Sequence, residues 1–147
     1  TGTYGLGDKG SPADTNDADG TIWPGADPWI DITQYPTLGG SLKMNWYAAG
    51  EAGYLFQGWV TLSPYPGITV GGTHLPANLD RAYTLTHGIP GWSGIVPPSE
   101  VMPTSVAIPN IAAYRGLNIY AFFATYTNYL GQIDIRDYAA PILMFLW

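Results

Sequence analysis

Charged residues are scarce in this chain, and cysteine is absent. Only 11% of the 147 residues are charged, against about 25% in an ordinary soluble domain. Without cysteine, the chain has neither disulfides nor thiolate-bound metals to stabilise it. Five Lys and Arg residues and a net charge of −6 exclude the basic surface that nucleic acid requires. Stability must therefore come from packing, ions or neighbouring chains.

Long hydrophobic runs are also missing. The longest, Ile142 to Trp147, has six residues, whereas a bilayer-spanning helix needs about 20. We therefore predict no membrane span. The sequence begins at Thr1 without an initiator methionine or an apolar leader. We expect a secreted, extracellular protein whose signal peptide has been removed.

Residues that act as general bases are few. The chain has two histidines, His74 and His87, and two glutamates, Glu51 and Glu100. Most aspartates lie in the first 31 residues, without apolar neighbours that would raise a pKa into a working range. We predict that the chain is not an enzyme and requires no cofactor. A secreted hydrolase is the third choice, and it would need a histidine paired with an aspartate beside a serine.

Turn residues and aromatic residues dominate what is present. The chain contains 19 Gly and 13 Pro, and 14% of its residues are aromatic. From residue 29 onward, short runs rich in β-formers alternate with turn residues, and no window shows helical spacing. This pattern predicts an all-β fold, an antiparallel sandwich of about eight strands with a jelly-roll or immunoglobulin-like arrangement over residues 29–147. Residues 1–28 read as an irregular arm rich in Gly, Asp and Pro.

The clearest strand is Ser41 to Ala48, in which Leu42, Met44 and Trp46 alternate with polar residues. We predict that it forms a hairpin with Gly53 to Leu62. Weaker strands are predicted at 29–33, 68–70, 82–86 and 101–108. A long strand is predicted at 117–127, a short one at 132–136 and a closing one at 141–147. The strand at 101–108 should be an edge strand because Pro103 cannot donate a backbone hydrogen bond.

Several short motifs follow one another along the chain: Gly5-Leu-Gly7, Tyr35-Pro-Thr-Leu-Gly39, Val106-Ala-Ile-Pro109 and Tyr114-Arg-Gly-Leu-Asn-Ile-Tyr120-Ala. This series resembles a group of short secreted bacterial β-sandwich domains that share a P-x-L-G and an I-P … G-L-x-Y-A pattern. The resemblance covers roughly Gly5 to Trp147. It implies a β-sandwich and export, and it carries no catalytic motif.

The acidic segment near the start could hold a metal. Asp14, Asn16, Asp17 and Asp19 place oxygen side chains on nearly alternate residues before Gly20, as calcium loops do. The spacing is one residue longer than in an EF-hand, and no glutamate occupies the bidentate position. A solvated acidic loop with Asx-turns is the alternative.

The outward faces of the predicted strands carry large apolar groups. Alternation with the core residues predicts that six side chains point away from the sandwich interior: Tyr47, Leu55, Trp59, Tyr120, Phe122 and Tyr126. Exposed apolar surface of several hundred Å² usually marks an interaction site. Alternatively, the N-terminal arm folds back and covers these residues.

The last segment, Ile142 to Trp147, has no alternation and should be apolar on both faces. Together these features predict a structural subunit of an extracellular, pilus-like filament, a homopolymer whose arm reaches a neighbouring copy and adds a strand at an open edge. The predicted assembly interface comprises Tyr47, Leu55, Trp59, Tyr120, Phe122, Tyr126, Ile142, Met144 and Trp147. A secreted carbohydrate-binding module that binds glycans is the alternative function, because exposed Trp and Tyr rings also stack on sugars.

Overall fold

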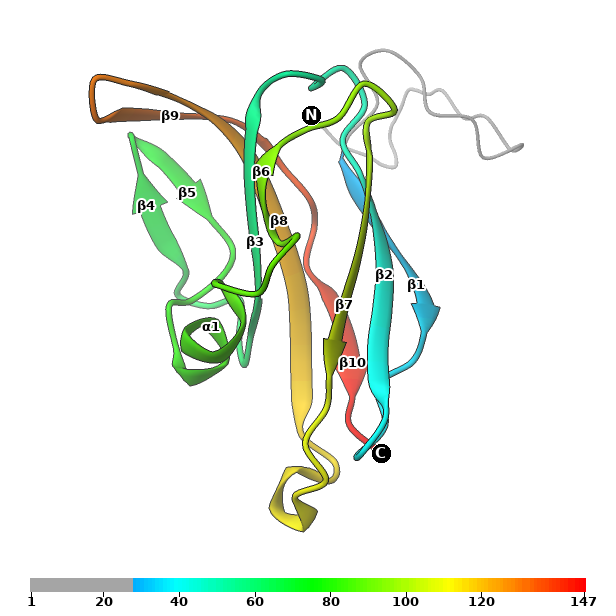
Figure 1. Cartoon of the computed structure of the whole chain (residues 1–147). Coiled ribbons are helices and arrows are strands. Elements are labelled where there is room, and N and C mark those ends of the chain that lie inside the picture. Colours follow the sequence, from blue (N-terminus) through cyan, green and yellow to red (C-terminus); the bar gives the residue numbers. More distant parts are fainter. Residues whose placement is uncertain (1–27) are drawn as a thin grey trace, which may run out of the picture.

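The computed structural model describes residues 28–147, which form two facing antiparallel sheets (Figure 1). The first sheet has the order β1-β2-β7, with β1 at Trp29–Gln34, β2 at Ser41–Tyr47 and β7 at Val101–Ala107. The second has the order β10-β8-β3-β6, and β9 also pairs with β8. Its strands are β3 (Leu55–Thr61), β6 (Ser93–Ile95), β8 (Asn118–Tyr129), β9 (Gln132–Tyr138) and β10 (Ile142–Phe145). The predicted all-β sandwich is confirmed.

The smaller elements cover one side of the second sheet. A two-stranded hairpin of β4 (Ile68–Val70) and β5 (Thr73–Leu75) is followed by helix α1 (Arg81–Thr86). A 3-10 turn, η1 (Ala112–Tyr114), precedes β8.

In the described residues, no helix is long and apolar enough to cross a membrane.

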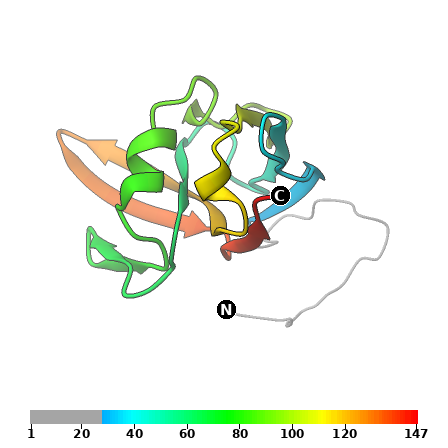
Figure 2. The same cartoon turned by 90° about the horizontal axis from the view of Figure 1, so that it is seen from below.

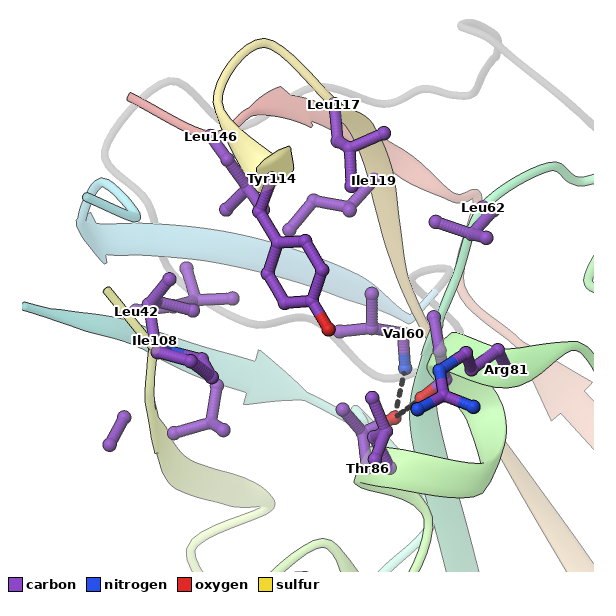
Figure 3. A pocket seen from close by; sticks show the side chains of 15 residues that line it. Leu42, Val60, Leu62, Arg81, Thr86, Ile108, Tyr114, Leu117, Ile119 and Leu146 are labelled. Carbon is purple, nitrogen blue, oxygen red and sulfur yellow. Dashed lines mark hydrogen bonds between the residues drawn. The ribbon is translucent and has the colours of Figure 1, made fainter. Parts of the chain in front are cut away.

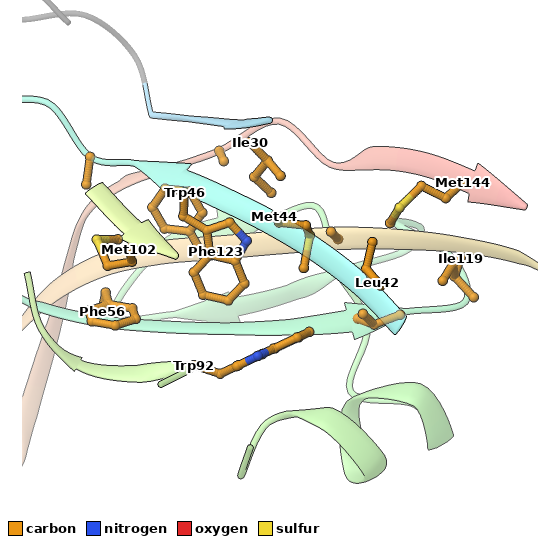
Figure 4. Packing of buried hydrophobic residues seen from close by; sticks show 14 of the residues in the cluster. Ile30, Leu42, Met44, Trp46, Phe56, Trp92, Met102, Ile119, Phe123 and Met144 are labelled. Carbon is orange, nitrogen blue, oxygen red and sulfur yellow. The ribbon is translucent and has the colours of Figure 1, made fainter. Parts of the chain in front are cut away.

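The main core lies between the sheets and is centred on Trp46 (Figure 4). Leu42, Met44 and Trp46 all point inward from β2 and are buried, as their alternation predicts. The Trp46 ring stacks on Phe123 of the opposite sheet, with centroids 5.2 Å apart and planes 5° apart. Phe56 and Trp92 meet the same ring edge-on. This aromatic cluster joins the two sheets.

The predicted hairpin between residues 41–48 and 53–62 is wrong, because β2 and β3 belong to different sheets. β2 pairs with β1 and β7, whereas β3 pairs with β6 and β8. Alternation identifies which side of a strand faces the core, but two strands that face each other across a core have the same pattern as two neighbours. The segment between β2 and β3 therefore crosses from one sheet to the other.

The strand predicted at 82–86 is also wrong, since these residues belong to α1. Asp80 caps the helix, and its side chain accepts a hydrogen bond from the backbone N–H of Tyr83. This local capping outweighs the β-propensity of a short Thr- and Tyr-containing run. The prediction for β7 is confirmed, because it is the edge strand of the first sheet.

A second apolar cluster lies on the outer side of the second sheet. It contains the buried residues Trp59, Leu75, Ala77, Phe122 and Ala124. The expectation that Trp59 and Phe122 are exposed is therefore wrong: they point away from the main core, yet they are only 5% and 0% exposed. The segment from β4 to α1 covers them, and the Trp59 indole N–H donates to the carbonyl of Asn78 at 3.1 Å.

The packing around Trp46 makes a sharp prediction about Gly58, which lies in the middle of β3. A Cβ at this position would overlap the Trp46 ring and lie 2.8 Å from the backbone oxygen of Phe122. We expect Gly58→Ala to lower the free energy of unfolding by about 1–3 kcal/mol through overpacking, measured by urea denaturation. Gly88→Ala is the matched control, because no atom lies within 4 Å of its Cβ position. Equal stability of the two variants would contradict this packing.

Candidate functional site

An apolar pocket of about 310 Å³ lies between the two sheets at the lower end of the sandwich in Figure 1. Leu42 and Val106 line it from the first sheet, and Val60 and Ile119 line it from the second. Helix α1 and turn η1 border it, and both are visible from below in Figure 2. The pocket is thus an opening into the space between the sheets.

The pocket has a buried floor and an exposed rim. Leu42, Val60, Ile119 and Leu146 form the floor and are all buried. The rim consists of the exposed leucines Leu62, Leu85 and Leu117. Figure 3 shows the Tyr114 ring extending toward Val60 between these walls. A pocket with leucines at its rim is suited to apolar side chains or apolar ligands.

Polar groups at the pocket are few, and they mainly hold α1 against β3. The Thr86 hydroxyl accepts a hydrogen bond from the Val60 N–H at 2.8 Å and donates to the carbonyl of Ala82 at 2.7 Å. The Asp80 carboxylate accepts from the hydroxyl of Thr61 and from the N–H of Leu62. Thr86 and Asp80 thus hydrogen-bond to the second half of β3, on the edge that has no strand partner beyond β6. Arg81 is the charged residue in the pocket lining.

A second apolar feature is the outer side of β10 and the carboxyl terminus. Leu143 is 45% exposed, Phe145 is 44% exposed and Trp147 is 62% exposed. Met144 and Leu146 alternate with them and are buried in the main core. The segment has apolar side chains on both faces, as its sequence predicts. The chain itself buries one of these faces in the main core, and the other face is exposed. We call Leu143, Phe145, Trp147 and the neighbouring Tyr120 the β10 face; Tyr120 pairs with Leu143.

The predicted interface residues do not form one surface. Trp59, Phe122 and Met144 are buried, so in this fold they offer no surface to a partner. Six others are partly or largely accessible: Tyr47, Leu55, Tyr120, Tyr126, Ile142 and Trp147. Tyr120 and Trp147 belong to the β10 face. Tyr47 lies on the other sheet, where its ring stacks on Trp29 at 4.2 Å.

The predicted calcium ligands Asp14, Asn16, Asp17 and Asp19 lie outside the described residues, as does nearly all of the arm. Within residues 28–147, no group of three or more His, Asp or Glu side chains is placed to hold a metal. Calcium binding stays a prediction.

The strongest ionic cluster joins Glu51 to β8 and β9. Arg136 Nε lies 2.8 Å from Glu51 Oε1, and the Thr125 hydroxyl donates to the same oxygen at 2.9 Å. The guanidinium also lies 3.6 Å from the ring centroid of Tyr54. The hydrogen bond to Glu51 raises the pKa of Arg136 above its ordinary value, although burial opposes this shift. The cluster serves as a structural tie between the loop after β2 and β9.

Within residues 28–147, the two histidines have other neighbours than a paired aspartate and serine. His87 Nδ1 lies 2.9 Å from the carbonyl oxygen of Tyr83, and its ring stacks on the Tyr83 ring. His74 lies in β5, where it faces Gly67. In the described residues, no histidine is recorded beside both an aspartate and a serine.

Neither the protein-family models nor the curated proteins include a match to this sequence. The resemblance to secreted bacterial β-sandwich domains is therefore still a prediction.

The pocket itself was missed in the sequence. One signal was available: Asp80, which precedes Ala82 and Thr86, has the side chain and the spacing of a helix cap. A helix there, instead of a strand, leaves the second half of β3 without a strand neighbour on the edge opposite β8. The apolar residues on both sides of that gap then line an opening.

We predict that the Thr86 hydroxyl holds the pocket wall in place. Thr86→Ala leaves the buried N–H of Val60 without its acceptor, which should lower the free energy of unfolding by about 1–3 kcal/mol. Thr86→Ser keeps the hydroxyl and should retain most of the stability. Thermal or urea denaturation of both variants tests this, and equal losses would show that the methyl group matters instead.

Proposed function

We propose that this chain is a non-catalytic structural subunit that polymerises with identical copies into an extracellular filament. The observation that carries the proposal is the β10 face, where three large apolar side chains are exposed, Leu143 and Phe145 on β10 and Trp147 just after it. Each leaves about half of its area open, so the patch is on the order of 300 Å². That is the size at which exposed apolar surface is usually functional.

The low charge of the chain favours a second copy as the partner. A protein that remains single in solution ordinarily carries many charges of both signs on its surface, whereas only 11% of this chain is charged. Among the side chains of the β10 face, Tyr120 is the one that can ionise. An apolar strand at a sheet edge also tends to associate with another chain.

The arrangement of the exposed apolar groups favours a filament over a closed dimer. The β8–β9 turn, with exposed Tyr129 and Leu130, lies at the upper end of the sandwich in Figure 1. The pocket and the carboxyl terminus lie at the lower end. A contact between unlike surfaces at opposite ends leaves each end of the pair free for another copy, so it propagates into a filament unless the rotation closes a ring.

The β10 face can be tested without disturbing the core. We expect Phe145→Lys to abolish polymers in negative-stain microscopy, because it places a charge in the apolar contact, while the midpoint of urea unfolding changes little. Leu79→Lys is the matched control, since Leu79 is 54% exposed and lies outside the pocket and the β10 face. Polymers that persist in Phe145→Lys would contradict the role of this face.

A carbohydrate-binding module is the second candidate, and the outer face of the first sheet favours it. Trp29 and Tyr47 are register partners whose rings are nearly parallel, with planes 12° apart. The next outward pair is Asp31 and Asn45, which could hydrogen-bond to sugar hydroxyls. Aromatic rings beside amide and carboxylate groups are the chemistry that recognises a glycan.

Under this alternative, Trp29→Ala should weaken binding to a polysaccharide by about tenfold, or about 1.4 kcal/mol. The measurement is a pull-down on insoluble polysaccharides, with Tyr65→Ala as the control because Tyr65 is exposed elsewhere. Unchanged retention of Trp29→Ala, or absence of retention for the unmodified protein, would reject the module.

A further inference from the structure

We propose that the pocket between the sheets receives residues Thr3 to Gly7 from a second copy of this chain. This inference rests on the proposed polymerisation and identifies the contact that propagates it. The occupant is an apolar side-chain pair, Tyr4 and Leu6, on an extended segment.

The size and lining of the pocket set what it can hold. Its volume of about 310 Å³ is roughly twice that of an engineered apolar cavity, about 150 Å³, that binds benzene. One aromatic and one aliphatic side chain therefore match its capacity. The buried floor is entirely aliphatic and Arg81 is the one charged residue of the lining, so most of the pocket surface favours an apolar occupant over a sugar or an ion.

The first 27 residues contain few large apolar side chains: Tyr4, Leu6, Ile22 and Trp23. In an extended chain, residues two apart point to the same side, whereas adjacent residues point to opposite sides. Tyr4 and Leu6 thus form a pair on one side, and Ile22 and Trp23 do not. Thr3, Gly5 and Gly7 alternate with them, so the other side of the segment has one small side chain and the backbone can approach closely at the two glycines.

The pocket and the start of β1 lie at opposite ends of the sandwich, which favours insertion of the segment into the pocket of a second copy over insertion into its own. β1, to which the segment is joined, begins at the upper end in Figure 1, whereas the pocket is at the lower end. In a head-to-tail stack, the upper end of one copy lies beside the pocket of the next. The 21 residues from Asp8 to Pro28 span up to about 70 Å when extended, which is ample for this connection.

Side-chain burial, not strand addition along β3, must supply the attraction. The edge of β3 is already bonded: the N–H groups of Gly58, Val60 and Leu62 donate to Trp92, Thr86 and Asp80. The open edge predicted from the sequence is therefore closed along β3. The pocket remains accessible to side chains through its leucine rim.

The absence of cysteine allows a direct cross-linking test in the full chain. We expect oxidation of the Leu6→Cys/Leu117→Cys variant to give a ladder of covalent multimers on non-reducing gels, because Leu117 lies on the pocket rim. Leu6→Cys/Ile95→Cys is the control, since Ile95 is exposed on β6, away from the pocket. A ladder at least tenfold stronger than the control supports the proposal.

Two cross-linking outcomes overturn it. A cross-link confined to the monomer means that the segment occupies the pocket of its own chain. Multimers no stronger than in the control mean that the segment does not reach the pocket.

A second variant separates this inference from the proposed function. Tyr4→Ser/Leu6→Ser changes no residue of the described fold, so it should unfold at the same urea concentration as the unmodified protein and yet lose its polymers. If the unmodified protein forms no polymers, the proposed function itself fails. If the double variant still polymerises while Leu130→Ser does not, the β8–β9 turn is the occupant and only this inference fails.

Discussion

The packing of Trp46 is the contact on which the rest of this fold depends. Its ring lies between the two sheets, stacked on Phe123 and bounded by Phe56 and Trp92, and the absence of a side chain at Gly58 makes room for it. Among the described residues, its indole N–H has no hydrogen-bond partner. An unpaired buried donor ordinarily costs about 1–3 kcal/mol, so the aromatic contacts must more than offset it. This core contains no disulfide, because the chain has no cysteine.

The position of this aromatic cluster between the sheets accounts for the pocket, and the limited cover on the outer side of the second sheet accounts for the β10 face. Where the aromatic rings fill the space, the sandwich is closed; toward the lower end, smaller aliphatic residues line the gap and leave the pocket. On the outer side of the second sheet, the segment from β4 to α1 covers Trp59 and Phe122 but does not reach β10. The chain thus covers part of its apolar surface, and Leu143, Phe145 and Trp147 are among the large apolar residues that it leaves exposed.

Most of the strands could be predicted from the sequence, because alternation and turn residues are local signals. The burial of Leu42, Met44 and Trp46 and the edge position of β7 followed from such signals. Strand pairing could not be predicted, since the patterns of β2 and β3 are the same whether they are neighbours or face each other. Short elements such as β5, β6 and α1 were missed or misassigned, because three to six residues carry too little periodicity.

The functional surfaces were only partly predictable, for a related reason. Alternation correctly placed Trp59 and Phe122 on the outer side of their sheet, but it gave no information on what covers that side. Trp147 was predicted at the interface and is exposed; Leu143 and Phe145, beside it, were hidden in a run that appeared uniformly apolar. The pocket depends on which elements are absent beside β3, a tertiary property without a local pattern.

The central claim is that the folded chain associates with itself through surfaces that it leaves uncovered. Sedimentation equilibrium of the unmodified protein over a range of concentrations tests this most directly. The account predicts a mean mass that rises with concentration far above the 15.8 kDa of one chain. A single 15.8 kDa species at every concentration would contradict it.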